Sequence, residues 1–230
     1  MSKPFMMTLE QTAGMTTREF AYRRLRKTIM VGDIRPGEAL TIRGIADAMD
    51  ISPTPVREAL RQLSSEGALK VLDNRRIVVP HMTPERLGEL IALRSTLEQH
   101  AARRAVAHIT ERQIDELVAL DKAQDEAILN NDNVGALVLN HAFHRTIYQA
   151  HPEQMIMPMV ESVWLQLGPF LRIAMEHVAE LYRVDRHQEA IAALRKRDEV
   201  AVAQAIHADI REGIGGFDRE AIVNLLRMSA

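Results

Sequence analysis

The stretch SPTPVREAL, residues 52–60, decides how the N-terminal part of this chain is expected to fold. Ser52 is a favoured N-cap residue and a proline follows it at the first helical position, so a helix is expected to begin here. Apolar residues recur at helical spacing along one face of this helix: Val56, Ala59, Leu60 and Leu63. Thr54, Arg57 and Arg61 recur at the same spacing on the opposite face. The stretch therefore predicts a helix with one buried face and one cationic face.

Two further helices are expected before this one and a hairpin after it. The first has its own apolar stripe, and the second begins after Thr41 as its N-cap. Apolar, β-branched runs at residues 69–72 and 77–79 predict a hairpin with a basic tip. A short helix, a tight link and a second helix with a cationic face fit a helix-turn-helix, whose second helix enters the major groove of DNA. A solvent-exposed face without function is the alternative for the helix alone, but its neighbours favour DNA binding.

The SPTPVREAL string, together with residues 21–25, 34–40 and 63–67, resembles the winged-helix domain of GntR-family transcriptional regulators. The resemblance covers nearly the whole segment and implies a winged helix-turn-helix that binds double-stranded DNA. It also implies phosphate or base contacts from five residues: Arg43, Ser52, Thr54, Arg57 and, at the wing tip, Arg75. Two residues depart from the family pattern, because Pro53 stands where Arg is common and Asn74 where the wing usually has Gly. These departures affect the expected operator sequence more than DNA binding itself.

The composition excludes several classes of protein. The chain has 230 residues, 47% of them hydrophobic, and no cysteine, so it can form a packed core but no disulfide, thiolate metal site or cysteine nucleophile. No apolar run approaches the ~20 residues that a membrane helix needs, and residues 1–15 lack the features of a secretory signal. A cytoplasmic protein without a membrane partner is therefore expected.

The net charge of −2 conceals an uneven distribution along the chain. Residues 1–80 contain 13 Lys and Arg against 9 Asp and Glu, whereas residues 81–230 contain 16 against 22. A basic front and an acidic back suggest two domains with different partners. Pro80 and Pro84 mark the junction between them. We expect a flexible tail at 1–16, a winged helix-turn-helix DNA-binding domain at 17–80, and a helical effector-binding and dimerisation domain at 81–230.

The C-terminal part is expected to be helical almost throughout. Apolar periodicity and capping residues predict helices at 84–107, 111–130, 134–150, 152–174, 178–196 and 198–213. The expected fold class is therefore mainly α, with the winged helix-turn-helix followed by an all-α bundle of six or seven helices. Residues 218–230 also show helical spacing, and the sequence leaves open whether they dock on their own domain or on a partner.

Polar residues interrupt the apolar stripes of four of these helices. They are Arg94, Asn140 with His144, His187, and Asp209. Burying such groups without partners costs about 1–3 kcal/mol each. A single one is commonly a hydrogen-bonded core residue, but several from different helices suggest a shared polar cavity, the place where helical bundles bind ligands and metals.

The bundle resembles the ligand-binding, FCD-type domain of the FadR-like branch of the GntR family at residues 93–98, 140–144, 186–187 and 193–198. The resemblance implies a divalent-metal site whose four ligand positions fall on Asn140, His144, His187 and Asp209. The usual pattern has Asp at the first of these positions and His at the last. The set still suits Zn, Ni or Mn with an open position for a ligand carboxylate. Family spacing selects Asp209 over His207, which points about 200° away around the helix, but periodicity alone does not decide between them.

An anionic effector is expected in the same cavity. A guanidinium matches a carboxylate in a two-point fork, so Arg94 and Arg172 are candidate effector-binding residues, together with Asn140. The alternative for Arg94 is an internal salt bridge to a carboxylate of the bundle. The alternative for Arg172 is a solvated side chain.

The sequence thus predicts a transcription factor and not an enzyme. A homodimer would place two winged helices on a pseudo-palindromic operator, and a small organic acid would modulate operator binding. The alternative is a metal-dependent hydrolase or oxygenase using the His/His/Asp cluster, for which the sequence offers no general base or nucleophile motif. A helical adaptor without any small-molecule site is a third alternative.

Overall fold

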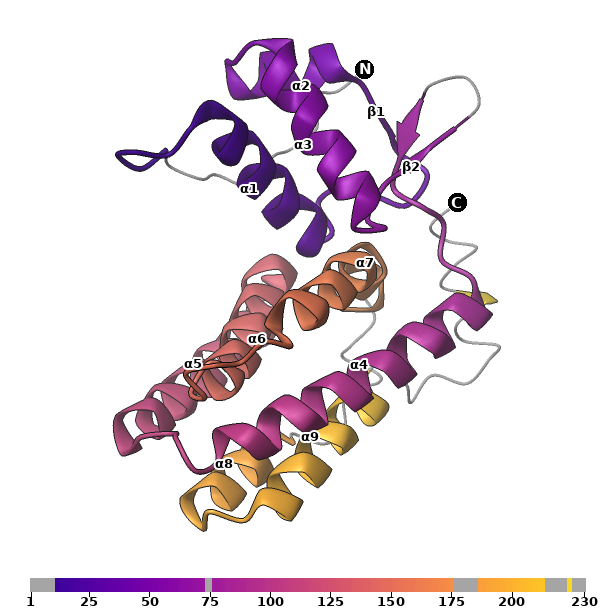
Figure 1. Ribbon diagram of the computed structural model, residues 1–230. Coiled ribbons are helices and arrows are strands. Elements are labelled where there is room, and N and C mark those ends of the chain that lie inside the picture. The colour runs from indigo at the N-terminus through magenta and orange to yellow at the C-terminus, as the bar shows by residue number, and fades with distance from the viewer. Residues whose placement is uncertain (1–10, 73–75, 176–185, 214–222, 225–230) are drawn as a thin grey trace.

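The computed structural model describes residues 11–72, 76–175, 186–213 and 223–224. Figure 1 shows an N-terminal unit of short helices and strands above a larger helical bundle. The mainly α fold class predicted from the sequence is confirmed. Most of the expected N-terminal tail, residues 1–10, lies outside the described residues, as does Arg75 at the wing tip. Among the described residues, none of the helices combines the length and the hydrophobicity that a membrane crossing requires.

The N-terminal unit is a winged helix. Its elements are α1 (Thr17–Met30), β1 (Ala39–Leu40), α2 (Ile42–Met49), α3 (Pro53–Ser65), β2 (Lys70–Val71) and β3 (Ile77–Val78). The three strands form an antiparallel sheet in the order β1-β3-β2. Thr41 caps α2 by accepting a hydrogen bond from Gly44 N, as predicted, and Asp50 ends the helix in the left-handed conformation with φ 56°. It begins the tight link of three residues, 50–52, between α2 and α3. Strand β1 was not expected, because two residues are too few to show an alternating pattern.

The C-terminal unit contains six helices within the described residues. They are α4 (Pro84–Ala105), α5 (Glu111–Leu129), α6 (Asn133–Tyr148), α7 (Met157–Met175), α8 (His187–Arg195) and α9 (Glu199–Gly213). The predicted caps are present, since Thr83 accepts from Arg86 N and Thr110 and Gln113 form a capping box. Four of the helices, α4, α5, α6 and α9, begin and end close to the predicted residues. The part of the expected 178–196 helix before His187 lies mainly outside the described residues.

The prediction that the helix of α7 begins at residue 152 is wrong, because residues 151–156 form turns. The backbone N–H of Glu153 donates to the His151 ring at 3.1 Å instead of entering a helix. The Gln154 amide donates to the carbonyls of Ala101 and Tyr148, both at 3.1 Å. These bonds hold the segment across α4 and α6, and α7 then starts at Met157.

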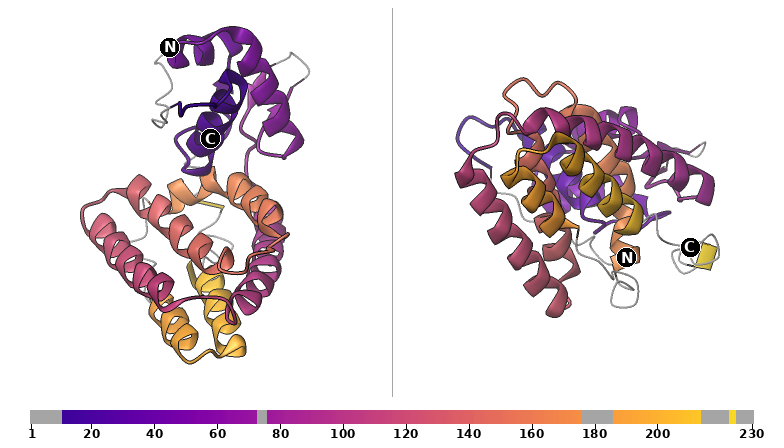
Figure 2. Two further views of the ribbon diagram at one scale, coloured as in Figure 1. Left: turned by 60° about the vertical axis from the view of Figure 1, so that its left-hand side comes forward. Right: turned by 90° about the horizontal axis from the view of Figure 1, so that it is seen from below.

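The two units meet where α1 packs against α7 (Figure 2). A Cβ on Gly168 of α7 would lie 2.2 Å from the backbone oxygen of Met30, so only glycine permits this approach. Ser162 Oγ donates to Glu66 O at 3.3 Å, and Arg86 Nη2 of α4 donates to Gly67 O, also at 3.3 Å. The end of α1 and the end of α3 are therefore both held against α7.

Gly168→Ala is expected to lower the free energy of unfolding by about 1–3 kcal/mol, the usual cost of overpacking, because the new methyl group meets backbone that cannot rotate away. Gly88→Ala on α4 is the matched control. Its Cβ would meet nothing within 4 Å, so the same change in an exposed helix should raise stability by up to about 1 kcal/mol. Thermal unfolding followed by circular dichroism measures both, and an unchanged or raised melting temperature for Gly168→Ala would contradict the close packing.

Candidate functional site

The outer face of α3 carries the residues expected to contact DNA. Thr54, Arg57 and Arg61 are exposed, whereas the apolar stripe of the same helix is buried, as predicted. Arg43 is exposed at the start of α2. Neither Arg43 nor Arg57 forms an ion pair with any residue that the structure describes. Ser52 is the N-cap of α3 but its side chain makes no capping hydrogen bond, so its hydroxyl remains available to a ligand.

A buried polar cluster lies inside the bundle, where three of the predicted metal-ligating residues meet. His144 comes from α6, His187 from the start of α8, and Asp209 from α9. One ligand atom from each lies within 4.8 Å of the others. His144 Nε2 is 3.2 Å from Asp209 Oδ2, and His187 Nε2 is 3.8 Å from Asp209 Oδ1. Asn140, one turn before His144, places its amide nitrogen 3.4 Å from His187 Nε2. The structure thus brings all four residues together.

The outer nitrogen of each histidine is held by a neighbour, which fixes the direction of the inner nitrogen. His187 Nδ1 lies 2.9 Å from Asp121 Oδ1 on α5, and a carboxylate oxygen accepts, so Nδ1 donates. His144 Nδ1 lies 3.0 Å from the hydroxyl oxygen of Tyr148. The one O–H of Tyr148 donates a hydrogen bond to Glu98 Oε2 at 2.6 Å, so its oxygen can only accept from His144. The His144 Nδ1 therefore also donates. In neutral rings both Nε2 atoms then carry lone pairs directed toward Asp209.

Two observations on the cluster concern charge. The Nε2 atom of His144 is fully buried and makes no hydrogen bond of acceptable geometry with any residue that the structure describes, although Asp209 lies beside it. Burial by itself raises the pKa of Asp209, but the neighbouring His144 and the charges of His187 and Arg94 outweigh it and lower the pKa to about 2. The carboxylate is therefore ionised at neutral pH and faces two imidazole nitrogens.

The structure decides between Asp209 and His207. Asp209 is buried in the cluster, whereas His207 is exposed on another face of α9. The His207 ring lies 2.6 Å from Ser95 Oγ and 3.2 Å from the Gln99 amide, both on α4. The family spacing therefore selected the residue that lies in the cluster.

Arg94 forms the internal ion pair that the sequence left open as an alternative to effector binding. Its Nε lies 2.6 Å from Glu98 Oε1, and both side chains are buried. Glu98 also accepts hydrogen bonds from Trp164 Nε1 and from the Tyr148 hydroxyl, each at 2.6 Å. Burial, followed by the Glu98 charge, raises the pKa of Tyr148 well above its ordinary value, so the hydroxyl stays protonated and can donate.

Sequence reasoning missed Glu98 and Asp121 as members of this site. Glu98 stands four residues after Arg94, a spacing typical of helical ion pairs. Asp121 continues the buried stripe of α5 after Ile114 and Leu117. Arg172, by contrast, lies at the junction of the two units. Arg172 packs against Gly32, where an added Cβ would lie 2.3 Å from the Cβ of Arg172. Burial raises the pKa of Asp33, and the positive charge of Arg172 partly opposes this rise.

The family and the relatives agree with this geometry. The model of bacterial regulatory proteins of the gntR family matches residues 17–79, and the FCD domain model matches residues 89–212. The HTH-type transcriptional regulator McbR of Escherichia coli K12 is 30% identical over 178 residues, which are 76% of this chain and 80% of McbR. The HTH-type transcriptional repressor RspR of the same strain is 27% identical over 209 residues, 90% of this chain and 92% of RspR. The solved structure of E. coli McbR/YncC matches with a TM-score of 0.80 at 26% identity, covering 94% of this chain and 100% of that one.

A winged helix joined to a helical bundle with a buried polar site defines a DNA-binding transcriptional regulator. More particularly, the chain belongs to the GntR family of bacterial regulators and carries an FCD domain. The matched families and these relatives are transcriptional regulators, which confirms the prediction that the protein is not an enzyme and argues against the hydrolase or oxygenase alternative.

Glu98→Gln is expected to lower the free energy of unfolding by about 3–5 kcal/mol, because it leaves the Arg94 guanidinium buried without a counter-charge. In the double variant Arg94→Met/Glu98→Gln the loss should be smaller, because the buried guanidinium that lacks a counter-charge is removed as well. Urea unfolding followed by the fluorescence of Trp164 measures both. A double variant less stable than the single one would contradict the ion pair as the source of the effect.

Proposed function

We propose that this regulator binds a pseudo-palindromic operator as a homodimer in the cytoplasm, and that a small organic acid in the bundle modulates this binding. The observation that carries the proposal is the buried His144, His187 and Asp209 cluster, which lies in the same chain as an exposed cationic helix face. Such a ligand acts only if it binds the DNA-competent and DNA-incompetent arrangements with different affinities.

The DNA contacts proposed are those of Arg43, Ser52, Thr54 and Arg57, with Arg75 of the wing outside the described residues. Arg57 projects from the exposed face of α3 without an ion pair in the described part of the chain, so its guanidinium is available to guanine or phosphate. A single recognition helix reads one half-site, and a two-fold dimer reads two. The excess of basic residues in this part of the chain is modest, which makes the second half-site important for affinity.

A divalent metal fits the buried cluster. Two imidazole lone pairs directed at an ionised carboxylate repel it unless a cation or proton lies between them, and the buried Nε2 of His144 has no hydrogen bond within the described part of the chain. The Asp121 carboxylate behind His187 and the Tyr148 hydroxyl behind His144 are the outer partners that orient histidine ligands. Two nitrogens and an oxygen, with the Asn140 amide beside them, suit Zn, Ni or Mn.

When bound, the metal would supply a Lewis-acid position for the carboxylate of an effector. Asn140 can orient such a ligand through its amide. Arg94 presents five N–H donors, of which Glu98 engages the Nε edge, so an effector carboxylate would either use the remaining donors or compete with Glu98. Effector recognition by Arg172 would require a ligand at the junction of the two units, where this residue lies.

Arg57→Ala is expected to weaken operator binding by about 1–3 kcal/mol, roughly a 5- to 150-fold rise in Kd, with relaxed specificity if the contact is to a base. The exposed Arg103 on α4 provides the control, since Arg103→Ala removes the same charge far from α3. Gel-shift or anisotropy titrations on the operator, at two salt concentrations, give the comparison. Equal weakening by both variants would contradict a direct contact of Arg57 with DNA, because the loss would then follow from the net charge of the protein alone.

Metal binding is tested by stripping the protein with a chelator and reloading it with Zn, Ni or Mn. We expect about one ion per chain and a raised melting temperature, because a ligand that binds only the folded state stabilises it. Asp209→Asn should weaken binding by more than about 100-fold, the upper range for losing an outer partner alone. The exposed Asp115→Asn on α5 should behave as the unmodified chain. Unchanged metal content in Asp209→Asn, by mass spectrometry, would exclude this cluster as the site.

A further inference from the structure

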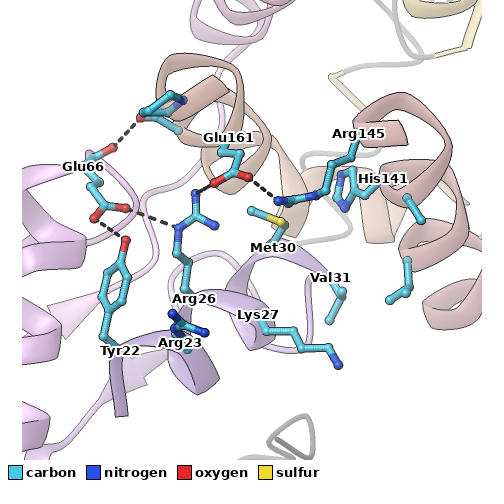
Figure 3. A pocket seen from close by; sticks show the side chains of 14 residues that line it. Tyr22, Arg23, Arg26, Lys27, Met30, Val31, Glu66, His141, Arg145 and Glu161 are labelled. Carbon is cyan, nitrogen blue, oxygen red and sulfur yellow. Dashed lines mark hydrogen bonds and ion pairs between the residues drawn. The ribbon is translucent and has the colours of Figure 1, made fainter. Parts of the chain in front are cut away.

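A second pocket, separate from the polar cluster, lies between the two units (Figure 3). It is bounded by α1 on the DNA-binding side and by α6 and α7 on the bundle side, and its volume is about 810 Å³. This is within the usual range of about 300–1,000 Å³ for small-molecule sites. Part of its surface is apolar, with Met30, Val31, Val138, Ala142 and Pro158 among the lining residues. The pocket therefore has the size and the apolar surface to hold a small organic molecule.

Within the described parts of the chain, Lys27 is the cationic residue of this pocket for which no ion pair is found. Arg26 bridges the units, with Glu66 Oε2 at 3.7 Å on one side and Glu161 Oε2 at 3.1 Å on the other. Arg145 also pairs with Glu161, as Figure 3 shows. Lys27 lines the same pocket, is half-buried, and forms no ion pair with any of the described residues. Its ammonium is therefore a positive charge beside the pocket without an acidic partner among the described residues.

His141 supplies a second group without a partner. Only 6% of this residue is exposed, it lines the pocket, and its Nε2 is buried without a hydrogen bond among the described residues. The ring stacks on Trp164 with centroids 4.9 Å apart, which fixes its orientation. The Nε2 nitrogen is covered by neighbouring atoms, so a polar atom of a ligand reaches it only when the surrounding side chains shift.

We propose that this interdomain pocket binds a small amphipathic organic anion, with its anionic group at Lys27, a polar atom near His141 Nε2 and its apolar body against Met30 and Val138. The site is distinct from the polar cluster, because Trp164 lies between them. One side of Trp164 faces His141 and the Arg145 guanidinium, which is 5.9 Å from the ring, while its Nε1 donates to Glu98. A ligand here contacts the DNA-binding unit and the bundle at once, so its binding is sensitive to their relative position.

The natural reporter for this site is Trp164, the only tryptophan of the chain. Octanoate is the probe, since it joins one carboxylate to an apolar tail; octylammonium has the same tail with the opposite charge, and acetate has the charge without the tail. We expect octanoate to change the fluorescence saturably and the other two to give no saturable change. Absence of a saturable response to octanoate, or an equal response to octylammonium, overturns the proposal.

Variants locate the binding. Lys27→Met should raise the Kd for octanoate about tenfold, the lower end for losing a hydrogen bond to a charged group. Lys122→Met is the control, because this lysine is exposed on α5 and far from the pocket. Asp209→Asn, which disrupts the polar cluster, should leave octanoate binding unchanged. If Lys27→Met binds as the unmodified chain does while Asp209→Asn loses binding, the anion occupies the polar cluster and the interdomain site is refuted, whereas the proposed effector site stands.

Discussion

The buried carboxylate of Glu98 is the interaction on which the arrangement of the bundle depends. It lies on α4 without solvent exposure, its charge is paired with Arg94, and it accepts hydrogen bonds from Tyr148 on α6 and Trp164 on α7. An ion in the interior is tolerated only when its partners are complete, because desolvation is costly. Three helices must therefore keep their relative positions for this carboxylate to remain satisfied.

The same interaction orders the polar cluster and reaches the DNA-binding unit. Because the Tyr148 hydroxyl donates a hydrogen bond to Glu98, its oxygen accepts one from His144 Nδ1. This bond orients the His144 ring so that its Nε2 faces Asp209 on α9. On the other side, Trp164 belongs to α7, whose Gly168 packs against the end of α1. The cluster, the ion pair and the junction of the two units thus form one continuous set of contacts. A ligand that moves residues of the polar cluster can therefore affect the junction of the two units through these contacts.

Much of this structure could be predicted from local signals. The caps at Thr41, Thr83 and Thr110 and the apolar stripes gave the helices, because hydrogen-bonding at a helix end and the helical repeat involve residues close in sequence. The start of α7 was wrong because Gln154 bonds to carbonyls of α4 and α6, partners that no local pattern reveals. Glu98 and Asp121 were missed for a similar reason, since a charged residue in an amphipathic helix is ordinarily exposed.

By itself, the sequence determined the mainly α fold class, the winged helix, the GntR resemblance and the set of polar residues on apolar stripes. Only the tertiary structure decided what those residues meet: that Arg94 is paired with Glu98, that Asp209 rather than His207 joins His144 and His187, and that Arg172 lies at the junction. The pocket between Lys27 and His141 also exists only once the two units pack. Helical periodicity gives the face on which a side chain lies, whereas its partners come from other helices, whose positions are set by the packing of the whole chain.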